Sequence, residues 1–257
     1  MNHFIALTRA VSDAITRCEL THVAREPIDL DKARAQHRAY ERTLETAAHC
    51  DIVHVAPAPE LPDAVFVEDT AIVVPEVAIL TRPGAASRRP ENAGVADVLR
   101  RYREVRSIDA PGTIDGGDVV VAGRRVFIGR SSRTNGAGIE QVRRILYPFG
   151  YNVTDVEVRG CLHLKSAATA VSDSRLLVNP AWIPAGAFNG LELLEIDPQE
   201  PNAANILRAG DSYIYASAFP RTGELLQRSG LQLNIIDMSE LAKAEGAVTC
   251  CSILVTV

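Results

Sequence analysis

The chain has 257 residues, 47% of them hydrophobic, and a formal net charge of −5. This length and apolar content can supply a large buried core, and the negative charge argues against a nucleic-acid-binding protein. The five cysteines lack the even number and the spacing of a disulfide framework, so we expect reduced thiols.

The sequence shows no sign of division into domains. No linker rich in Pro, Ser or Gly interrupts it, and we expect one domain over residues 1–257. The first residues lack the basic and apolar regions of a secretory signal, and no apolar run is long enough to span a membrane. These features predict a cytoplasmic protein with a small-molecule ligand. They leave the oligomeric state open, and a homodimer is compatible with them.

Three segments have apolar residues at helical spacing, namely 31–50, 95–102 and 139–146. The third follows Thr134 and Asn135, which are residue types that favour helix N-caps, and it ends near Gly150. We expect three amphipathic helices that cover the faces of sheets.

Between these helices the sequence predicts pairs of strands separated by turn residues. The pairs are 66–74 with 78–81, 119–122 with 126–129, 167–171 with 176–178, and 206–207 with 213–216. Three of these strand pairs are followed by similar segments, each of which leads toward a helix. Arg82 and Arg130 in these segments are 48 residues apart, and Arg130 and Pro220 are 90 apart, close to two further steps of that length. The spacing predicts an internal repeat that brings the first strand of each unit to one centre.

A vicinal pair of thiols, Cys250 and Cys251, lies in the apolar run 248–257, which the pattern predicts to be a strand. A thiolate is a strong nucleophile near neutral pH, so one of these thiols is a candidate for covalent catalysis. Neighbouring side chains of a strand point to opposite faces, so only one of the two could face a substrate.

His163 is the single histidine after residue 54. It lies between two leucines, a setting more typical of a core histidine than of a catalyst. Asp115 precedes two glycines, which let the backbone turn sharply or approach closely, so its carboxylate could orient an imidazole. An ordinary turn has the same pattern. Neither the dinucleotide-binding nor the P-loop glycine pattern occurs in the chain.

Glu68 and Asp69 are adjacent carboxylates within an apolar run that predicts a strand. Buried charges need partners, and either a structural salt bridge or a guanidinium ligand would supply one. Arg88 and Arg133 follow two of the strand pairs and could hold a carboxylate, although exposed arginines are common.

Eight segments occur in the order that is typical of one known family. They are LPDAVFVEDTA, ILTRPGAASRR, GTIDGGDVV, FIGRSSRTN, LHLKSA, the AAN of 203–205, FPRT and VTCCSILV. Together they span about residues 33–254 and resemble the dimethylarginine dimethylaminohydrolases of the pentein, or guanidino-group-modifying, superfamily.

The resemblance implies an α/β fold, a five-bladed propeller of ββαβ repeats known as the pentein fold. It also implies hydrolysis of asymmetric dimethylarginine and monomethylarginine to citrulline and dimethylamine or methylamine. The reaction would pass through a covalent thiouronium adduct of cysteine, and no metal or organic cofactor would be needed.

By the matching motifs, the resemblance implies that Cys250 is the nucleophile and that His163 is the general acid and base, oriented by Asp115. Some bacterial relatives carry Glu where this chain has Asp115. Glu68 and Asp69 would hold the guanidinium group, with Asp69 the more direct contact.

The resemblance also assigns the amino-acid end of the substrate. Asp63 and the carbonyl of Leu20 would hold its amino group, and Arg88 and Arg133 would hold its carboxylate. The carbonyl of Ala244 would contribute to binding.

Two other functions compete with this interpretation. One is an arginine or agmatine deiminase, although those relatives are typically longer and an agmatine enzyme would not need Arg88 and Arg133 as carboxylate ligands. The other is a zinc- or redox-responsive thiol protein that uses Cys250, Cys251 and His163. Adjacent cysteines do not both easily reach one tetrahedral ion, which disfavours the zinc site.

Overall fold

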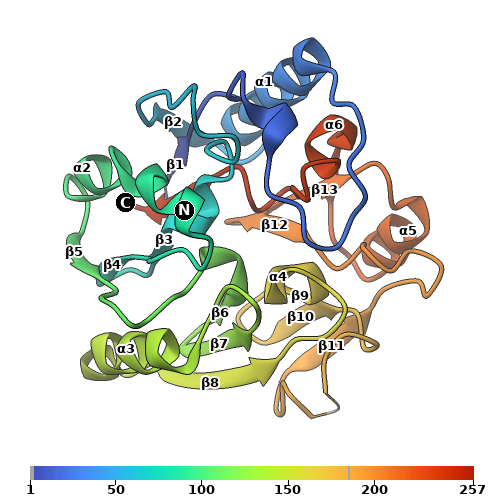
Figure 1. Cartoon of the computed structure of the whole chain (residues 1–257). Helices are drawn as coiled ribbons and strands as arrows, with labels where there is room; N and C mark the ends of the chain where they lie inside the picture. Colours follow the sequence, from blue (N-terminus) through green and yellow to red (C-terminus); the bar gives the residue numbers. More distant parts are fainter. Residues whose placement is uncertain (1–2, 185) are drawn as a thin grey trace.

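Five three-stranded sheets stand around a common axis in the computed structural model, which describes residues 3–184 and 186–257 (Figure 1). In each sheet the middle strand pairs antiparallel with the strand nearest the axis and parallel with the outermost strand. A helix connects the middle strand to the outermost one in four of these sheets. The structure therefore confirms the predicted five-bladed α/β propeller of ββαβ repeats.

The strands nearest the axis surround a central cavity of about 1120 Å³, and each contributes residues to its wall. They are β3 (Ala71–Val73), β6 (Val119–Ala122), β9 (Ala168–Ala170), β12 (Ile206–Ala209) and β15 (Ile253–Thr256). Strand β9 contacts β6 and β12, and β15 contacts β3, so neighbouring blades meet along the axis.

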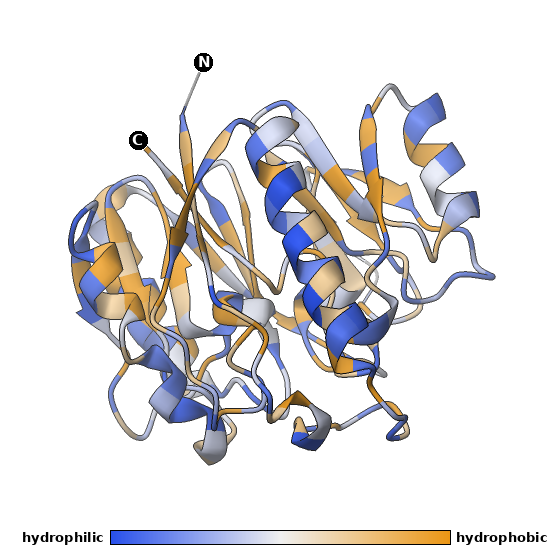
Figure 2. Cartoon of the chain, turned by 90° about the horizontal axis from the view of Figure 1, so that it is seen from above, coloured by the Kyte–Doolittle hydropathy of each residue, from blue (hydrophilic) through white to orange (hydrophobic). Residues whose placement is uncertain are grey.

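The other strands complete the blades. The middle strands are β4 (Val77–Leu80), β7 (Arg125–Arg130), β10 (Arg175–Val178), β13 (Ser212–Ala216) and β1 (Phe4–Thr8). The outermost strands are β5 (Glu104–Ser107), β8 (Asn152–Glu157), β11 (Glu192–Glu195), β14 (Leu233–Ile236) and β2 (Cys50–His54). Because β1 from one end of the chain pairs with β15 from the other, the two ends close the ring, and they lie on the same side of the molecule (Figure 2).

The helices that connect middle to outermost strands are α1 (Leu30–Thr46), α2 (Val95–Leu99), α3 (Gly136–Leu146) and α5 (Pro220–Arg228). Two shorter helices, α4 (Leu164–Ala167) and α6 (Ser239–Ala242), precede β9 and β15. The strands are largely hydrophobic, whereas the helices carry many hydrophilic residues (Figure 2). None of the helices in the described residues is long and apolar enough to cross a membrane.

The predicted helices form where their apolar faces and caps indicate. Asn135 accepts a hydrogen bond from the backbone N–H of Gly138 at 2.9 Å, which confirms the predicted N-cap of α3. In contrast, the first helix, predicted over 31–50, ends four residues earlier than predicted. Helix α1 ends at Thr46, and Cys50 already begins β2 after His49 reverses the chain with φ of 51°.

The first parts of two predicted strands, 66–74 and 248–257, are turns in the structure, and the strands begin only at Ala71 and Ile253. Residues 67–70 form a 3-10 turn that leads into β3, and Cys250 and Cys251 lie in a turn just before β15. Each turn has a local hydrogen bond, from the Thr70 hydroxyl to the carbonyl of Val67 and from the N–H of Cys250 to the carbonyl of Ala247. The turns leave adjacent side chains free to meet partners on different blades.

Candidate active site

The candidate catalytic residues all lie just before strands that surround the axis. Glu68 and Asp69 precede β3, Asp115 precedes β6, His163 precedes β9 and Cys250 precedes β15. Since these strands begin at the same end of the propeller, the side chains gather at one end of the central cavity. Glu68 itself forms part of the cavity wall.

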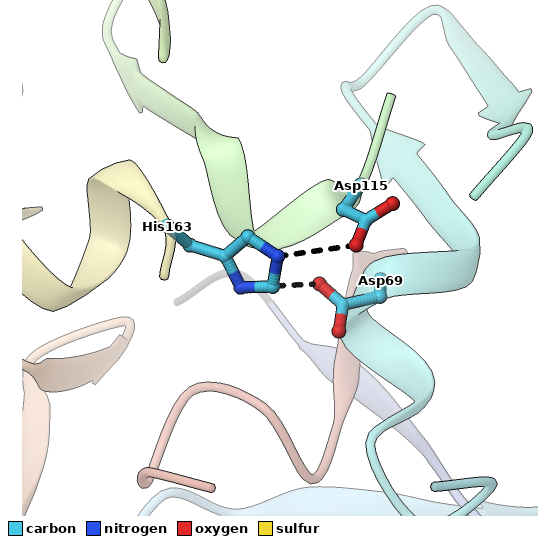
Figure 3. Close-up of side chains that lie close together, drawn as sticks. All are labelled: Asp69, Asp115 and His163. Carbon is cyan, nitrogen blue, oxygen red and sulfur yellow. Dashed lines mark hydrogen bonds and ion pairs between the residues drawn. The ribbon is translucent and has the colours of Figure 1, made fainter. Parts of the chain in front are cut away.

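His163 is buried between two carboxylates (Figure 3). Its Nε2 lies 3.1 Å from Oδ2 of Asp115, and its Nδ1 lies 3.9 Å from Oδ1 of Asp69. Burial alone would lower the pKa of His163, but the charges of Asp69, Asp115 and Asp118 outweigh it and raise this pKa to about 9. The imidazole is therefore protonated near neutral pH and can act as an acid.

The backbone beside His163 is held by Asp118, which is completely buried. Asp118 accepts hydrogen bonds from the N–H of Leu164 at 2.9 Å and from the hydroxyl of Ser131 at 2.5 Å. Gly117 allows the close approach, because a Cβ there would lie 2.5 Å from Nδ1 of His163. A side chain at position 117 would therefore collide with the imidazole, which explains why the second residue of the predicted Gly-Gly turn is a glycine.

Asp69 connects the imidazole to an arginine. Its Oδ2 accepts from Nη1 of Arg88 at 2.6 Å, and its Oδ1 accepts from the N–H of Gly117 at 2.8 Å. Burial would raise the pKa of Asp69, but the charges of His163 and Arg88 lower it to about 2. Asp69 is thus ionised at any physiological pH.

Arg88 is buried and already surrounded by acceptors. It pairs with Glu91 at 2.8 Å as well as with Asp69, and it donates to the carbonyls of Asp63 and Phe66. The structure therefore directs this side chain to carboxylates of the protein itself, on the side of Asp69 that is away from Gly117.

Glu68 forms a salt bridge within the protein, which is one of the two alternatives that the sequence left open. Lys165 Nζ lies 2.6 Å from its Oε1, and the hydroxyl of Thr249 donates to its Oε2 at 2.7 Å. Burial raises the pKa of Glu68, an effect that Lys165 and Thr249 oppose. Its N–H donates to the carbonyl of Cys250 at 3.1 Å, so the carboxylate segment and the thiol segment are joined directly.

The two thiols differ in environment. Cys250 is partly exposed, whereas Cys251 is fully buried in an apolar cluster with Tyr40. Burial, together with the carboxylates of Glu68 and Asp69, raises the pKa of Cys250 to about 12. The Cys250 thiol is therefore protonated in the free protein, and within the described residues no hydrogen bond joins it to His163.

Asp69, Asp115 and His163 also offer ligand atoms within 4.8 Å of one another, a spacing that could hold a metal ion. A protonated imidazole has no lone pair for a metal, so the raised pKa of His163 opposes metal binding near neutral pH. The expected absence of a metal cofactor stays a prediction.

The residues predicted to bind the amino-acid end lie around the segment 19–23. Asp63 is buried and accepts from the N–H of Glu19 at 3.1 Å, and burial raises its pKa. Arg133 donates from Nη2 to the hydroxyl of Thr21 at 3.2 Å, and its buried Nη1 has no partner among the described residues. Leu20 is half-buried between these contacts.

Ala244 lies after α6 and is buried in the apolar cluster against which Cys250 packs. The residue assignments missed four neighbours that the structure brings to the site, Lys165, Asp118, Thr249 and Glu245. Lys165, Asp118 and Thr249 lie inside motifs already singled out, and their charge or hydroxyl was the available signal. No pattern in the sequence pointed to Glu245.

Similar proteins and similar solved structures both include dimethylarginine dimethylaminohydrolases. No family model matches the sequence. The chain is 40% identical over 252 residues to N(G),N(G)-dimethylarginine dimethylaminohydrolase of Streptomyces coelicolor, covering 96% of this chain and 95% of that protein. It is 35% identical over 255 residues to the enzyme of the same name from Pseudomonas aeruginosa, covering 98% of each.

Solved structures show the same relationship. A cysteine-to-serine variant of the Pseudomonas aeruginosa enzyme in complex with citrulline has a TM-score of 0.90 and 32% identity, and covers 98% of both chains. A histidine-to-glycine variant of a dimethylarginine dimethylaminohydrolase, in an adduct with S-methyl-L-thiocitrulline, has a TM-score of 0.92 and 33% identity, with 98% of this chain and 99% of that chain covered. The N-terminal domain of a cyanobacterial arginine dihydrolase shares the fold at 18% identity, with a TM-score of 0.84 and coverage of 100% and 98%.

Proposed function

Because the chain belongs to the dimethylarginine dimethylaminohydrolase family of the pentein superfamily, we propose that it hydrolyses Nω-methylated arginines to citrulline and a methylamine. It is a hydrolase that acts on C–N bonds of amidines. The observation that carries the proposal is the position of Asp69. Its Oδ1 lies 3.9 Å from Nδ1 of His163, and the N–H of its neighbour Glu68 donates to the carbonyl of Cys250 at 3.1 Å. A cation bound at Asp69 would lie between a nucleophile and an acid.

The guanidinium group is the chemistry that fits these carboxylates. Its planar array of N–H donors matches carboxylate oxygens, and its positive charge offsets the charges of Glu68 and Asp69. Burial and those two charges raise the pKa of the Cys250 thiol in the free protein, so a cation that offsets the charges lowers this pKa. The substrate thereby helps to activate the group that attacks it.

In the first step the Cys250 thiol gives its proton to solvent, and the thiolate adds to the guanidinium carbon, forming a C–S bond. The bond from that carbon to the dimethylamino nitrogen then breaks. His163, protonated because its pKa is raised to about 9, gives its proton to the departing nitrogen. Dimethylamine leaves, and a thiouronium adduct on Cys250 remains.

In the second step the neutral His163 takes a proton from water, which attacks the carbon of the adduct. The C–S bond breaks, the hydroxyl group of the adduct gives its proton to the departing sulfur of Cys250, and citrulline forms. Asp115 holds the imidazole in one orientation through both steps, since its Oδ2 is 3.1 Å from Nε2. The free Nδ1 is then the nitrogen available to the substrate and the water.

Arg133 is the group best placed for the substrate carboxylate. Its Nη1 is buried without a partner among the described residues, and such a donor is costly unless a ligand pairs with it. Asp63 and the carbonyl of Leu20 would hold the amino group. Arg88, which the sequence predicts to hold the substrate carboxylate together with Arg133, would also keep Asp69 ionised through their 2.6 Å contact.

An arginine deiminase would use the same centre and release ammonia. The released amine, ammonia or dimethylamine, therefore distinguishes the two functions. Purified protein treated with a chelator should form citrulline and dimethylamine from asymmetric dimethylarginine. Cys250→Ser should abolish this turnover and Cys251→Ser should retain it. Turnover of arginine or agmatine without turnover of methylated arginine would overturn the proposal, as would full activity of Cys250→Ser. The single domain, the cytoplasmic location and a homodimer stay predictions.

A further inference from the structure

Glu245 joins the end of the chain to a segment more than 200 positions earlier. Its carboxylate accepts hydrogen bonds from three consecutive backbone N–H groups, those of Thr21, His22 and Val23. The contacts to Thr21 and Val23 are each 3.0 Å from a carboxylate oxygen. Successive N–H groups that converge in this way form an anion-binding concavity, and here the anion is a side chain of the protein itself.

The segment that Glu245 holds carries groups of the amino-acid end of the site. The N–H of Glu19 donates to Asp63 at 3.1 Å, and the hydroxyl of Thr21 accepts from Arg133 at 3.2 Å. Leu20 lies between these two contacts, so its carbonyl is placed by both. The base of the segment is closed by Arg25, which donates to the carbonyls of Thr16 at 2.7 Å and Cys18 at 2.6 Å. Residues 19–23 are otherwise mostly exposed.

The backbone of Glu245 is unusual for its residue type. Its φ is +57°, in the left-handed region that favours glycine. Glycine would adopt this conformation without strain but would lack the carboxylate. The choice of glutamate at this position therefore points to a requirement for the side chain.

We propose that Glu245 is a positioning residue that holds residues 19–23 over the amino-acid end of the substrate and so sets the preference for substrates that carry an α-amino acid. The inference rests on the proposed function, because it assigns to Glu245 the selectivity of that same site. Among the described residues the Glu245 side chain bonds only to the backbone of Thr21, His22 and Val23, so its effect falls on binding and not on the chemical step.

The test is Glu245→Gly, which removes the carboxylate and relieves the left-handed backbone. The KM for asymmetric dimethylarginine should rise about tenfold, while kcat stays within about twofold. The melting temperature should stay equal or rise, which separates positioning from folding. Glu245→Gln, whose amide oxygen can still accept, should give an intermediate KM.

A small amidine reagent reports on the reacting end alone. 2-Chloroacetamidine is a cation without an amino-acid group, and its rate of alkylation of Cys250 should change by less than about twofold in Glu245→Gly. His49→Gly is the matched backbone control, because His49 also has positive φ at 51°. It lines the end of the central cavity opposite Cys250, next to the pairing of Cys50 with Phe4. Glu26→Gln is the matched charge control on an exposed carboxylate beside the same segment. Neither control should change KM.

Limited trypsin digestion gives a second readout that does not need turnover. Cleavage after Arg17 and Arg25 should be faster in Glu245→Gly than in the unaltered protein or His49→Gly. An unchanged KM with unchanged cleavage, or a parallel loss of kcat and of chloroacetamidine alkylation, would overturn the inference. If the unaltered protein does not turn over methylated arginine, the proposed function fails, and the cleavage rates still show whether Glu245 holds the segment.

Discussion

Nε2 of His163 lies 3.1 Å from Oδ2 of Asp115, and both side chains are buried. The contact stabilises the protonated imidazole and leaves Nδ1 on the side of Asp69, 3.9 Å from its Oδ1. It joins residues 48 positions apart, one from each of two neighbouring blades.

Asp115→Asn should lower the pKa of His163 because it removes one of the charges that raise this pKa to about 9. We expect kcat to fall about 100-fold, since the acid is less protonated and less well oriented. In a plot of kcat against pH, the decline on the basic side should move to lower pH. Proton NMR titration of the His163 ring, compared with Asp109→Asn on the exposed surface, checks the assignment. An unmoved decline on the basic side would contradict it.

The thiol of Cys250 should react slowly in the free protein, because its pKa is raised to about 12 by burial and by Glu68 and Asp69. Alkylation of Cys250 by iodoacetamide should keep rising with pH above about 9, without a plateau near neutrality. Mass spectrometry distinguishes Cys250 from the four buried cysteines. A plateau near pH 7, as in a thiolate–imidazolium pair, would be inconsistent with activation by the substrate.

Lys165→Met should destabilise the protein, because it leaves the buried carboxylate of Glu68 without its cation. We expect a loss of about 2–3 kcal/mol in the free energy of unfolding, measured in urea. The double variant with Glu68→Gln should recover most of this loss, since the buried charge is then gone. Additive losses in the double variant would show that the 2.6 Å ion pair contributes little.

Gly117→Ala should inactivate the protein, because its Cβ would lie 2.5 Å from Nδ1 of His163 and 2.8 Å from Oδ1 of Asp69. The clash displaces the imidazole from the two carboxylates, and we expect a loss of stability of about 1–3 kcal/mol. Gly223→Ala in α5 is the control, because a Cβ there meets no atom closer than 3.8 Å. Thermal unfolding and citrulline formation are measured for both. Normal activity of Gly117→Ala would show that the imidazole can move.

The His163–Asp69 pair should make stability depend on pH at both extremes. The pKa of His163 is raised to about 9, so its contribution is complete below the unfolded pKa of about 6.5 and is lost as pH rises through about 9. The pKa of Asp69 is lowered to about 2, so its contribution is complete above about 4 and is lost as pH falls toward 2.

His163→Gln should therefore be less stable than the unaltered protein by about 2–3 kcal/mol near pH 6, with the difference shrinking as pH rises to about 10. Urea unfolding at several pH values measures it, and His22→Gln on the exposed segment is the control. A difference that is constant with pH would mean that packing, and not charge, accounts for the contribution of His163.

Local patterns predicted much of the scaffold. The spacing of apolar residues located α3 and its cap at Asn135, and it located strand pairs such as β6 with β7. The 48-residue step predicted that the first strands would meet at one centre. The outermost strands were missed because their apolar residues do not form long runs, as in Glu192–Glu195 of β11, and because their parallel partners lie across a long connection.

The turns at 67–70 and at Cys250 were read as strands because apolar alternation does not distinguish a strand from a tight turn beside one. The sequence pattern also did not predict the partners of the buried charges. Lys165 is 97 residues from Glu68, and the local sequence around either residue does not indicate that the two form an ion pair.

The sequence by itself determined the family, the repeat and the chemical types at the site, because motifs in order and periodic apolar residues are properties of the chain alone. The tertiary structure decided which thiol is partly exposed, that Asp69 lies against both His163 and Arg88, and that Glu245 holds residues 19–23. The physical reason is that charge interactions and burial depend on distances between blades. Those distances arise only when strands far apart in the chain close around one axis.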